Sequence, residues 1–400
     1  MLIATIVVLT IPNCYSKCIV SKSIKYPQRF VSTMADRFLG DIYNVLAKHE
    51  NGNLIFSPLS LHALLTMLNL GASGNTSSQI NIPLRMSCDK NIAAEGYRQL
   101  IGLLLNIEEV KLKFVNKIFV SQTSVLKSSF ESKMTFFFKS NTSLIDLTIP
   151  EKAAEEINRW YAEETENHIT NLYKPSDIEN AKILLANAIY FKGNWTNKFD
   201  PRNTRPYRFY VNGRKESVKN VPMMFINAEF QWGYIPDLKS GFIELPYGNQ
   251  TNPAMKMTII LPNLGVDIRD VERNISKLAT IKYHGSTSMV ALRLPKFTIE
   301  SEFDLKPILK EIGITDIFEN TANFQDMTES SGLKVTKVVQ KVVIEVNEEG
   351  SEATVASGMT MQSREASPDF IVNRPFLYFI SMENLKWILF AGRVMDPTAV

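Results

Sequence analysis

One segment constrains the fold of this chain more than any other, because a regular strand pattern passes there directly into a polar stretch. Residues 338–346 (VVQKVVIEV) alternate between a mainly apolar set and a set that carries Lys341 and Glu345. Alternation with a period of two predicts a β-strand. Residues 348–358 (EEGSEATVASG) follow, and they are too polar for a core but rich in small residues that a strand accepts. The segment therefore predicts a strand followed by a loop that can itself become a strand.

The composition describes a globular protein without a strong net charge. Of 400 residues, 45% are hydrophobic and 21% are charged, which suits one large domain or two modest ones. Because 44 basic residues stand against 41 acidic residues, the net charge is only +3. So small a charge produces no overall field that attracts nucleic acid or an anionic membrane. We therefore expect neither as a partner.

The N-terminus has the pattern of a secretory signal peptide. Residues 2–11 form a short apolar run, and Cys14 and Ser16 supply small residues before a cleavage site, although no Lys or Arg precedes the run. We predict a signal peptide over residues 1–16 and a mature domain over residues 17–400, which makes the protein secreted and extracellular. This run is too short to cross a bilayer, and no later run is long enough.

Secretion gives meaning to the sequons and the cysteines. Cys14 leaves with the signal peptide, so Cys18 and Cys88 remain as either one disulfide or two free thiols. Five Asn-x-Ser/Thr sequons are candidate glycosylation sites: Asn75, Asn141, Asn194, Asn249 and Asn274.

The order of the predicted elements indicates an α+β protein. Helical spacing and capping signals, among them Ser57 followed by Pro58, predict helices over residues 35–48, 58–71, 91–105, 152–168 and 304–312. Strand patterns occur over residues 113–121, 183–191, 254–261, 289–300, 335–346, 376–381 and 387–394. Helices dominate early and strands late, without regular βαβ alternation. The long stretch without an assignment is 348–374, and a loop of that length in a compact domain is usually functional or disordered.

Motifs for catalysis or metal binding are missing from the sequence. The four histidines, His49, His62, His168 and His284, have no metal-ligand spacing. The sequence also has no Gly-x-Ser-x-Gly elbow, phosphate-binding loop, Cys-x-x-Cys pair or dinucleotide fingerprint. We therefore expect no metal, no cofactor and no enzymatic activity. The alternative is a secreted hydrolase whose site is assembled from distant residues.

Five motifs, in order, resemble the serpin family of protease inhibitors. They are residues 53–60 (NLIFSPLS), 185–195 (LANAIYFKGNW), 345–350 (EVNEEG), 373–376 (NRPF) and 390–393 (FAGR). The resemblance extends from about residue 35 to the C-terminus. It implies one large α+β domain with three β-sheets, about nine helices and a large central sheet. It also implies an exposed reactive-centre loop over about residues 350–368.

The resemblance implies inhibition by a conformational trap. In serpins a protease attacks the exposed loop, and the acylated loop inserts into the central sheet before deacylation is complete. Counting in the family register, both from Gly350 and from Phe376, gives Arg364-Glu365 as the reactive bond. Arg suits the specificity pocket of a trypsin-like protease, whose carboxylate can bind the guanidinium. We therefore expect a covalent complex between a monomer of this chain and an Arg-specific serine protease; a carrier or structural protein without inhibition is the alternative.

The loop residues suit insertion. If alternate residues face inward, one set runs from Ser351 through Ala353 and Val355 to Ser363 and is uncharged, while the other set carries every charge. Such a strand can bury one face without burying an ion. The resemblance assigns the loop hinge to Glu348, Glu349, Gly350, Ser351, Glu352, Ala353, Thr354, Val355 and Ala356.

Other matching positions are structural. The resemblance assigns Ser57, Ser60 and Asn187 to the region under the point where the sheet opens, and Trp195 to the top, where the loop enters. It pairs Lys296 with Glu348. Gln340 stands where many serpins have His, a departure that arthropod members often share.

Basic residues do not indicate strong glycosaminoglycan dependence. Heparin activation in some serpins uses basic residues near the fourth helix, where residues 89–105 contain only Lys90 and Arg98. Lys111, Lys113 and Lys117 share one face of a predicted strand, with Lys127 nearby, and we interpret them as a solvated face.

Overall fold

The computed structural model describes residues 24–107, 110–213, 216–248, 255–275, 283–348, 367–382 and 387–399. The predicted signal peptide, residues 1–16, lies outside this part of the chain. The described part contains nine α-helices: α1 (Pro27–His49), α2 (Pro58–Gly71), α3 (Gly74–Leu84), α4 (Lys90–Leu104), α5 (Ser128–Phe138), α6 (Pro150–Glu164), α7 (Pro175–Ile178), α8 (Ile268–Glu272) and α9 (Leu305–Glu311).

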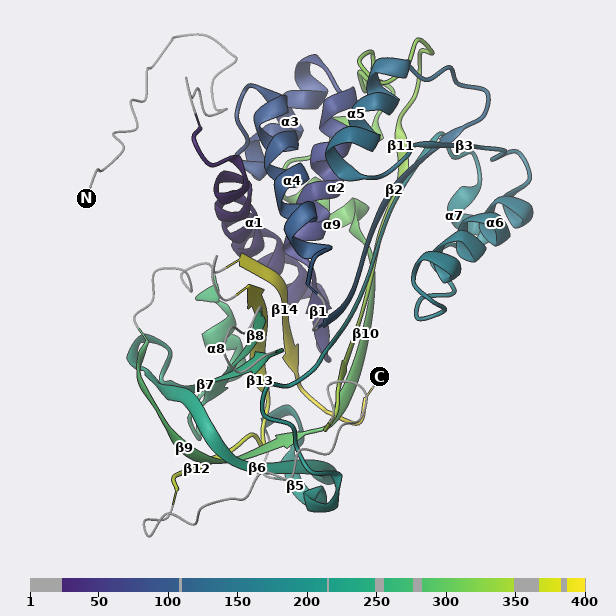
Figure 1. Cartoon of the computed structure of the whole chain (residues 1–400). Coiled ribbons are helices and arrows are strands. Elements are labelled where there is room, and N and C mark those ends of the chain that lie inside the picture. Colours follow the sequence, from purple (N-terminus) through teal and green to yellow (C-terminus); the bar gives the residue numbers. More distant parts are fainter. Residues whose placement is uncertain are drawn as a thin grey trace.

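The strands follow the predicted trend toward the second half of the chain (Figure 1). They are β1 (Leu54–Phe56), β2 (Val110–Ser121), β3 (Ser143–Ile145), β4 (Ile183–Gly193), β5 (Arg205–Tyr210), β6 (Val218–Ile235), β7 (Ser240–Tyr247), β8 (Met255–Pro262), β9 (His284–Pro295), β10 (Phe297–Asp304), β11 (Val335–Val346), β12 (Asp369–Ile371), β13 (Phe376–Met382) and β14 (Trp387–Val394). The α+β class is therefore confirmed.

A five-stranded mixed sheet in the order β10-β11-β4-β2-β3 forms the centre of the molecule. In it, β11 pairs in parallel with β4 and antiparallel with β10. The central strand β4 is buried along almost its whole length, which explains its continuous apolar sequence. Strand β3 pairs only with residues 119–121 of β2, so this ladder leaves the first part of the outer edge of β2 uncovered.

Helices cover both faces of the central sheet, with α6 and α7 on one side and α2, α4 and α5 on the other (Figure 1). Helix α2 is buried along its whole length. Its start is set locally, because the Ser57 hydroxyl accepts a hydrogen bond from Ser60 N and Pro58 occupies the first turn. Helix α6 places Ala153, Ile157 and Tyr161 in a separate apolar cluster against β2, β4 and β11.

The other described strands form one nine-stranded sheet in the order β1-β14-β13-β8-β7-β6-β9-β12, with β5 paired to β6. The expected three sheets are therefore two by hydrogen bonding. The reason is that β6 is long and pairs with β9 over residues 223–234, while its ends also pair with β5 and β7. The strand predicted over residues 289–300 is in fact two strands, β9 and β10, which separate after Pro295, a residue that has no N–H for the ladder.

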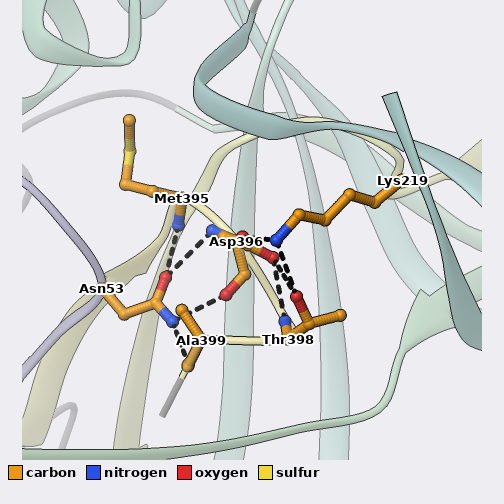
Figure 2. Close-up of polar contacts among 6 residues, drawn as sticks. All are labelled: Asn53, Lys219, Met395, Asp396, Thr398 and Ala399. Atoms are coloured by element: carbon orange, nitrogen blue, oxygen red, sulfur yellow. Dashed lines mark hydrogen bonds and ion pairs between the residues drawn. The ribbon is translucent and has the colours of Figure 1, made fainter. Parts of the chain in front are cut away.

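The C-terminal segment after β14 is held against Asn53, which directly precedes β1, and against Lys219 of β6, as Figure 2 shows. The amide of Asn53 donates to Asp396 O and Ala399 O at 2.7 Å each and accepts from the backbone N–H groups of Met395 and Asp396. Lys219 of β6 contacts the Asp396 carboxylate at 2.5 Å. These bonds fix the C-terminal segment to two parts of the chain that are far from it in sequence. Within the described residues no helix has the length and apolar character needed to span a membrane.

Candidate functional site

The candidate site is the seam between β4 and β11, the two parallel strands at the centre of the sheet. Nine residues of β11 between Val335 and Ile344 pair directly with residues of β4. The predicted hinge follows β11, and Glu348 is its one member within the described residues. The other hinge residues and the predicted bond Arg364-Glu365 lie outside them. Three groups of side chains hold the seam closed.

The first group is a buried network centred on Gln340 of β11. Its amide accepts a hydrogen bond from Ser57 N at 3.2 Å and donates to Ser57 O at 3.1 Å. It also donates to Asn187 Oδ1 of β4 at 2.6 Å, directly across the seam. Gln340 and Asn187 are each 0% exposed. Gln340 therefore contacts Ser57 and Asn187, two residues that the resemblance placed under the point where the sheet opens.

The network continues from Asn187 to the helix beneath the sheet. The Asn187 amide donates to Ser60 Oγ of α2 and to Asn116 Oδ1 of β2. Sequence reasoning missed Asn116. Its signal is that it shares the strand face of Phe114 and Ile118, so a polar side chain stands at an inward position. The network thus links β2, β4, β11 and α2 through amides and hydroxyls.

The second group closes the end of the seam at which β4 and β11 both finish. Lys192 of β4 contacts Glu345 of β11 at 3.3 Å, with both side chains partly exposed. The indole N–H of Trp195 donates to Asn347 O at 2.8 Å, and the ring stacks on Tyr247 at a centroid distance of 4.3 Å. Trp195, which the resemblance placed at the loop entrance, therefore contacts the backbone directly before the predicted hinge.

The third group fixes Glu348, the described member of the predicted hinge. Its carboxylate contacts Lys296 Nζ at 2.7 Å and accepts from Thr204 Oγ1 at 2.7 Å, while its backbone carbonyl accepts from Phe199 N. The Glu348 side chain is 8% exposed and that of Lys296 is 39% exposed. Burial by itself raises the pKa of Glu348, but the bonds from Lys296 and Thr204 outweigh it and lower the pKa below its ordinary value. Sequence reasoning expected the ion pair and missed Thr204.

The other candidate residues lie away from the seam. Cys88 is disulfide-bonded, and since Cys14 and Cys18 lie outside the described residues, the pairing with Cys18 stays a prediction. Of the sequon asparagines, Asn75 and Asn141 are exposed, Asn194 and Asn274 are partly buried, and Asn249 lies outside the described residues.

The lysines of β2 differ from the expected solvated face. Lys111 and Lys113 do contact a surface residue, Glu166, at 2.5 and 2.7 Å. Lys117 is only 4% exposed and lies 4.5 Å from the ring centroid of Trp160 on α6. The expectation is wrong for Lys117, because α6 crosses this part of the strand and covers it.

The described contacts hold β4 and β11 together without a covalent link. The side-chain bonds that cross from β4 to β11 join Gln340 to Asn187 and Lys192 to Glu345. Separating the strands breaks these bonds and the parallel ladder, but no covalent link. In the part of the chain that the structure describes, no group of His, Cys, Asp and Glu residues could hold a metal ion.

Comparison with known proteins agrees with this architecture. A family model described as serpin (serine protease inhibitor) matches residues 33–397. Serine protease inhibitor 42Dd of Drosophila melanogaster is 36% identical over 374 residues, which cover 92% of this chain and 98% of that protein.

Solved structures agree as well. Serpin48 of the insect Tenebrio molitor has a TM-score of 0.84 at 28% identity, covering 94% of this chain and all of that chain. Human thyroxine-binding globulin has a TM-score of 0.82 at 25% identity, covering 93% of this chain and all of that chain. The family match and the fold lead to the same conclusion: this chain is a member of the serpin family, whose family model describes serine protease inhibitors.

Proposed function

We propose that this serpin is a secreted suicide substrate for an Arg-specific, trypsin-like serine protease, which attacks the bond between Arg364 and Glu365. One observation carries the proposal. The strands β4 and β11 are direct parallel neighbours, and the predicted loop begins where β11 ends. A loop that turns back from β11 can therefore enter the seam beside the strand to which it is attached.

The direction of the strands favours this insertion. A segment that turns back from β11 runs antiparallel to β11, and because β4 is parallel to β11, it also runs antiparallel to β4. Insertion thus replaces one parallel ladder by two antiparallel ladders, which are slightly more stable per residue. About ten additional ladder bonds at about 0.5 to 1.5 kcal/mol each contribute on the order of 10 kcal/mol. That gain rivals the stability of a typical domain, so insertion is effectively irreversible.

The length of the loop also suits the trap. Residues 351–364, fully extended at about 3.3 Å per residue, span roughly 46 Å. A protease held on Arg364 is carried over that distance when the strand forms. The alternate uncharged residues from Ser351 to Ser363 let one face of the new strand pack without a buried ion. We infer that the role of the trap is to limit an extracellular proteolytic cascade.

The test is complex formation with trypsin. We expect equimolar trypsin to give an SDS-stable complex, with a released C-terminal fragment that begins at Glu365. A matched pair of variants examines the insertion step. Ser351→Arg places a charge in the set predicted to face inward and should convert the inhibitor into a cleaved substrate. Glu352→Arg places the same charge one residue later, in the outward set, and should still form the complex.

Three results contradict the proposal. A loop that is cut without any stable complex argues for a carrier. Thyroxine-binding globulin, whose fold is similar, is an example of a binding protein with this fold. A fragment that begins at another residue makes the assigned register wrong. Equal behaviour of Ser351→Arg and Glu352→Arg contradicts the alternation. Secretion is tested separately, by sequencing the N-terminus of the exported protein, which we expect near Lys17.

A further inference from the structure

A cavity of about 160 Å³ lies at the outer edge of β2, where the central sheet meets the helices on both of its faces. Its apolar wall comes from the end of α4, from one face of β2 and from the end of α5, through Leu104, Leu112, Phe114 and Phe138. Trp160 and Glu164 of α6 line it from the other face of the sheet. The edge is accessible because β3 pairs with β2 only at residues 119–121.

Lys117 lines this cavity as a buried cation. Lys117 is 4% exposed, and its Nζ lies over the Trp160 ring at 4.5 Å from the centroid. Within the described residues it has no ion pair and no hydrogen bond, unlike Lys111 and Lys113, which both contact Glu166. Burial lowers the pKa of Lys117, and the more distant carboxylate of Glu164 opposes this shift.

A buried ammonium group without hydrogen-bond acceptors is costly, so it favours a ligand that supplies them. A carboxylate does so and also neutralises the charge in a place that water screens weakly. The apolar wall favours a hydrocarbon group on the same molecule. A cavity of about 150 Å³ accepts a benzene ring, so the volume here fits one aromatic ring or a chain of a few carbons.

We propose that this cavity is a binding site for a small amphiphilic carboxylic acid, whose carboxylate contacts Lys117 and whose apolar group packs between Leu104, Phe114 and Phe138. The indole of Trp160 covers the ammonium group from the α6 side. Lys139 also lines the cavity, but it is exposed and reaches solvent, so it does not face the same desolvation. Asn141, a candidate glycosylation site, lies at the rim, and a glycan there would restrict entry.

Occupation of the site has a consequence that rests on the proposed inhibitory function. Insertion of a strand widens the sheet by about 4.8 Å, so β2 must move relative to α4 or α6. A ligand that contacts all three elements opposes that movement. Binding itself does not depend on inhibition, and the two can therefore fail separately.

The test uses benzoate as the probe and isothermal titration calorimetry at pH 7. Wild-type protein should bind benzoate, and it should bind benzyl alcohol, which has no charge, at least tenfold more weakly. Lys117→Met keeps the aliphatic part of the side chain and should lose at least tenfold in benzoate affinity. Lys139→Met is the matched control, since it removes an exposed cation from the same cavity, and its affinity should stay within twofold.

Several outcomes overturn the inference. They are no heat of binding at millimolar benzoate, equal affinity for benzoate and benzyl alcohol, and unchanged affinity in Lys117→Met. The comparison of the two probes uses wild-type protein, so it holds even where a variant folds poorly. If benzoate binds as expected but does not slow complex formation with trypsin, the site stands and only the coupling to insertion is wrong.

Discussion

Replacement of Gln340 by Met tests whether the buried amide network holds the seam closed. The two side chains are similar in length, but Met removes every bond that Gln340 makes with Ser57 and Asn187. Ser57 O keeps a partner, because it also accepts from Leu61 N at 3.2 Å. Ser57 N and Asn187 Oδ1 lose the bonds that Gln340 supplied, and both residues are buried. Two buried groups without a partner cost about 1 to 3 kcal/mol each, or about 2 to 6 kcal/mol together.

This cost has a measurable size in a thermal unfolding experiment. With about 2.1 cal/mol/K of unfolding entropy per residue, a loss of that size lowers the Tm of a 400-residue chain by roughly 2 to 7 °C. The measurement is tryptophan fluorescence at a fixed scan rate, because unfolding of a large domain is often irreversible. Gln325→Met is the matched control; Gln325 is exposed, and its substitution should change stability by less than about 0.5 kcal/mol.

A conservative replacement separates hydrogen bonding from shape. His at position 340 offers one donor and one acceptor when neutral, so Gln340→His should recover part of the loss above pH 7 and fall toward Gln340→Met in acid. If the Tm of Gln340→Met equals that of the wild type, or if Gln325→Met falls equally, the network does not stabilise the closed seam. The argument from orphaned groups would then be wrong.

Two further predictions concern buried charge. His62 is buried against Tyr97 and Leu84 O, and burial lowers its pKa to about 4. His62 protonates near pH 6.5 in the unfolded chain but only near pH 4 in the folded chain, so the free energy of unfolding falls by about 3 kcal/mol as the pH drops from about 6.5 to 4. Urea unfolding at pH 7 and pH 5 should therefore show a smaller decrease in the free energy of unfolding for His62→Gln than for the wild type. An equal decrease in both proteins would contradict this origin. Arg393 and Glu272 form a buried ion pair at 2.7 Å. Arg393→Met should lower the free energy of unfolding by about 3 to 5 kcal/mol, because it leaves the buried carboxylate of Glu272 without its partner. The double variant with Glu272→Gln should recover part of this free energy in the same assay. A double variant no more stable than Arg393→Met alone would refute this reason.

Elements with a strong local signal were predicted nearly to the residue. The strand expected over residues 335–346 is β11, and the helix that begins after Ser57 is α2, with the same start and end as expected. Both depend on neighbours in sequence: alternation in β11, and a serine cap followed by proline in α2. Such signals act over a few residues, so no knowledge of the rest of the fold is needed.

Elements whose character depends on distant partners were missed. Strand β6 has 18 residues but an irregular pattern of exposed and buried positions, because its partners change from β5 and β9 to β9 and β7 along its length. Helix α3 is mostly polar and contains Pro83, so it has no clear apolar face in the sequence. For both elements, tertiary packing decides the conformation and local propensity does not.

The candidate site divides in the same way. The hinge, the uncharged alternate set and the assigned bond Arg364-Glu365 can be read from consecutive residues or from the family register, and they stay predictions that only experiment can test. The contacts that hold the seam could not be read in this way. Ser57 and Gln340 are 283 residues apart, and although the strand pattern marks Asn116 as a polar residue at an inward position, it does not indicate which partners Asn116 bonds.

What the sequence alone determined is therefore the strand β11 and the family, while its reading of the segment that follows β11 stays a prediction. Alternation, small residues and the order of motifs are properties of neighbouring residues or of sequence order, so they can be read without knowledge of the tertiary structure. Only the tertiary structure decided that β4 lies directly beside β11 and that Lys117 is buried under α6 instead of solvated. Both facts depend on which surfaces of distant segments cover one another, since burial and desolvation are properties of the packed chain.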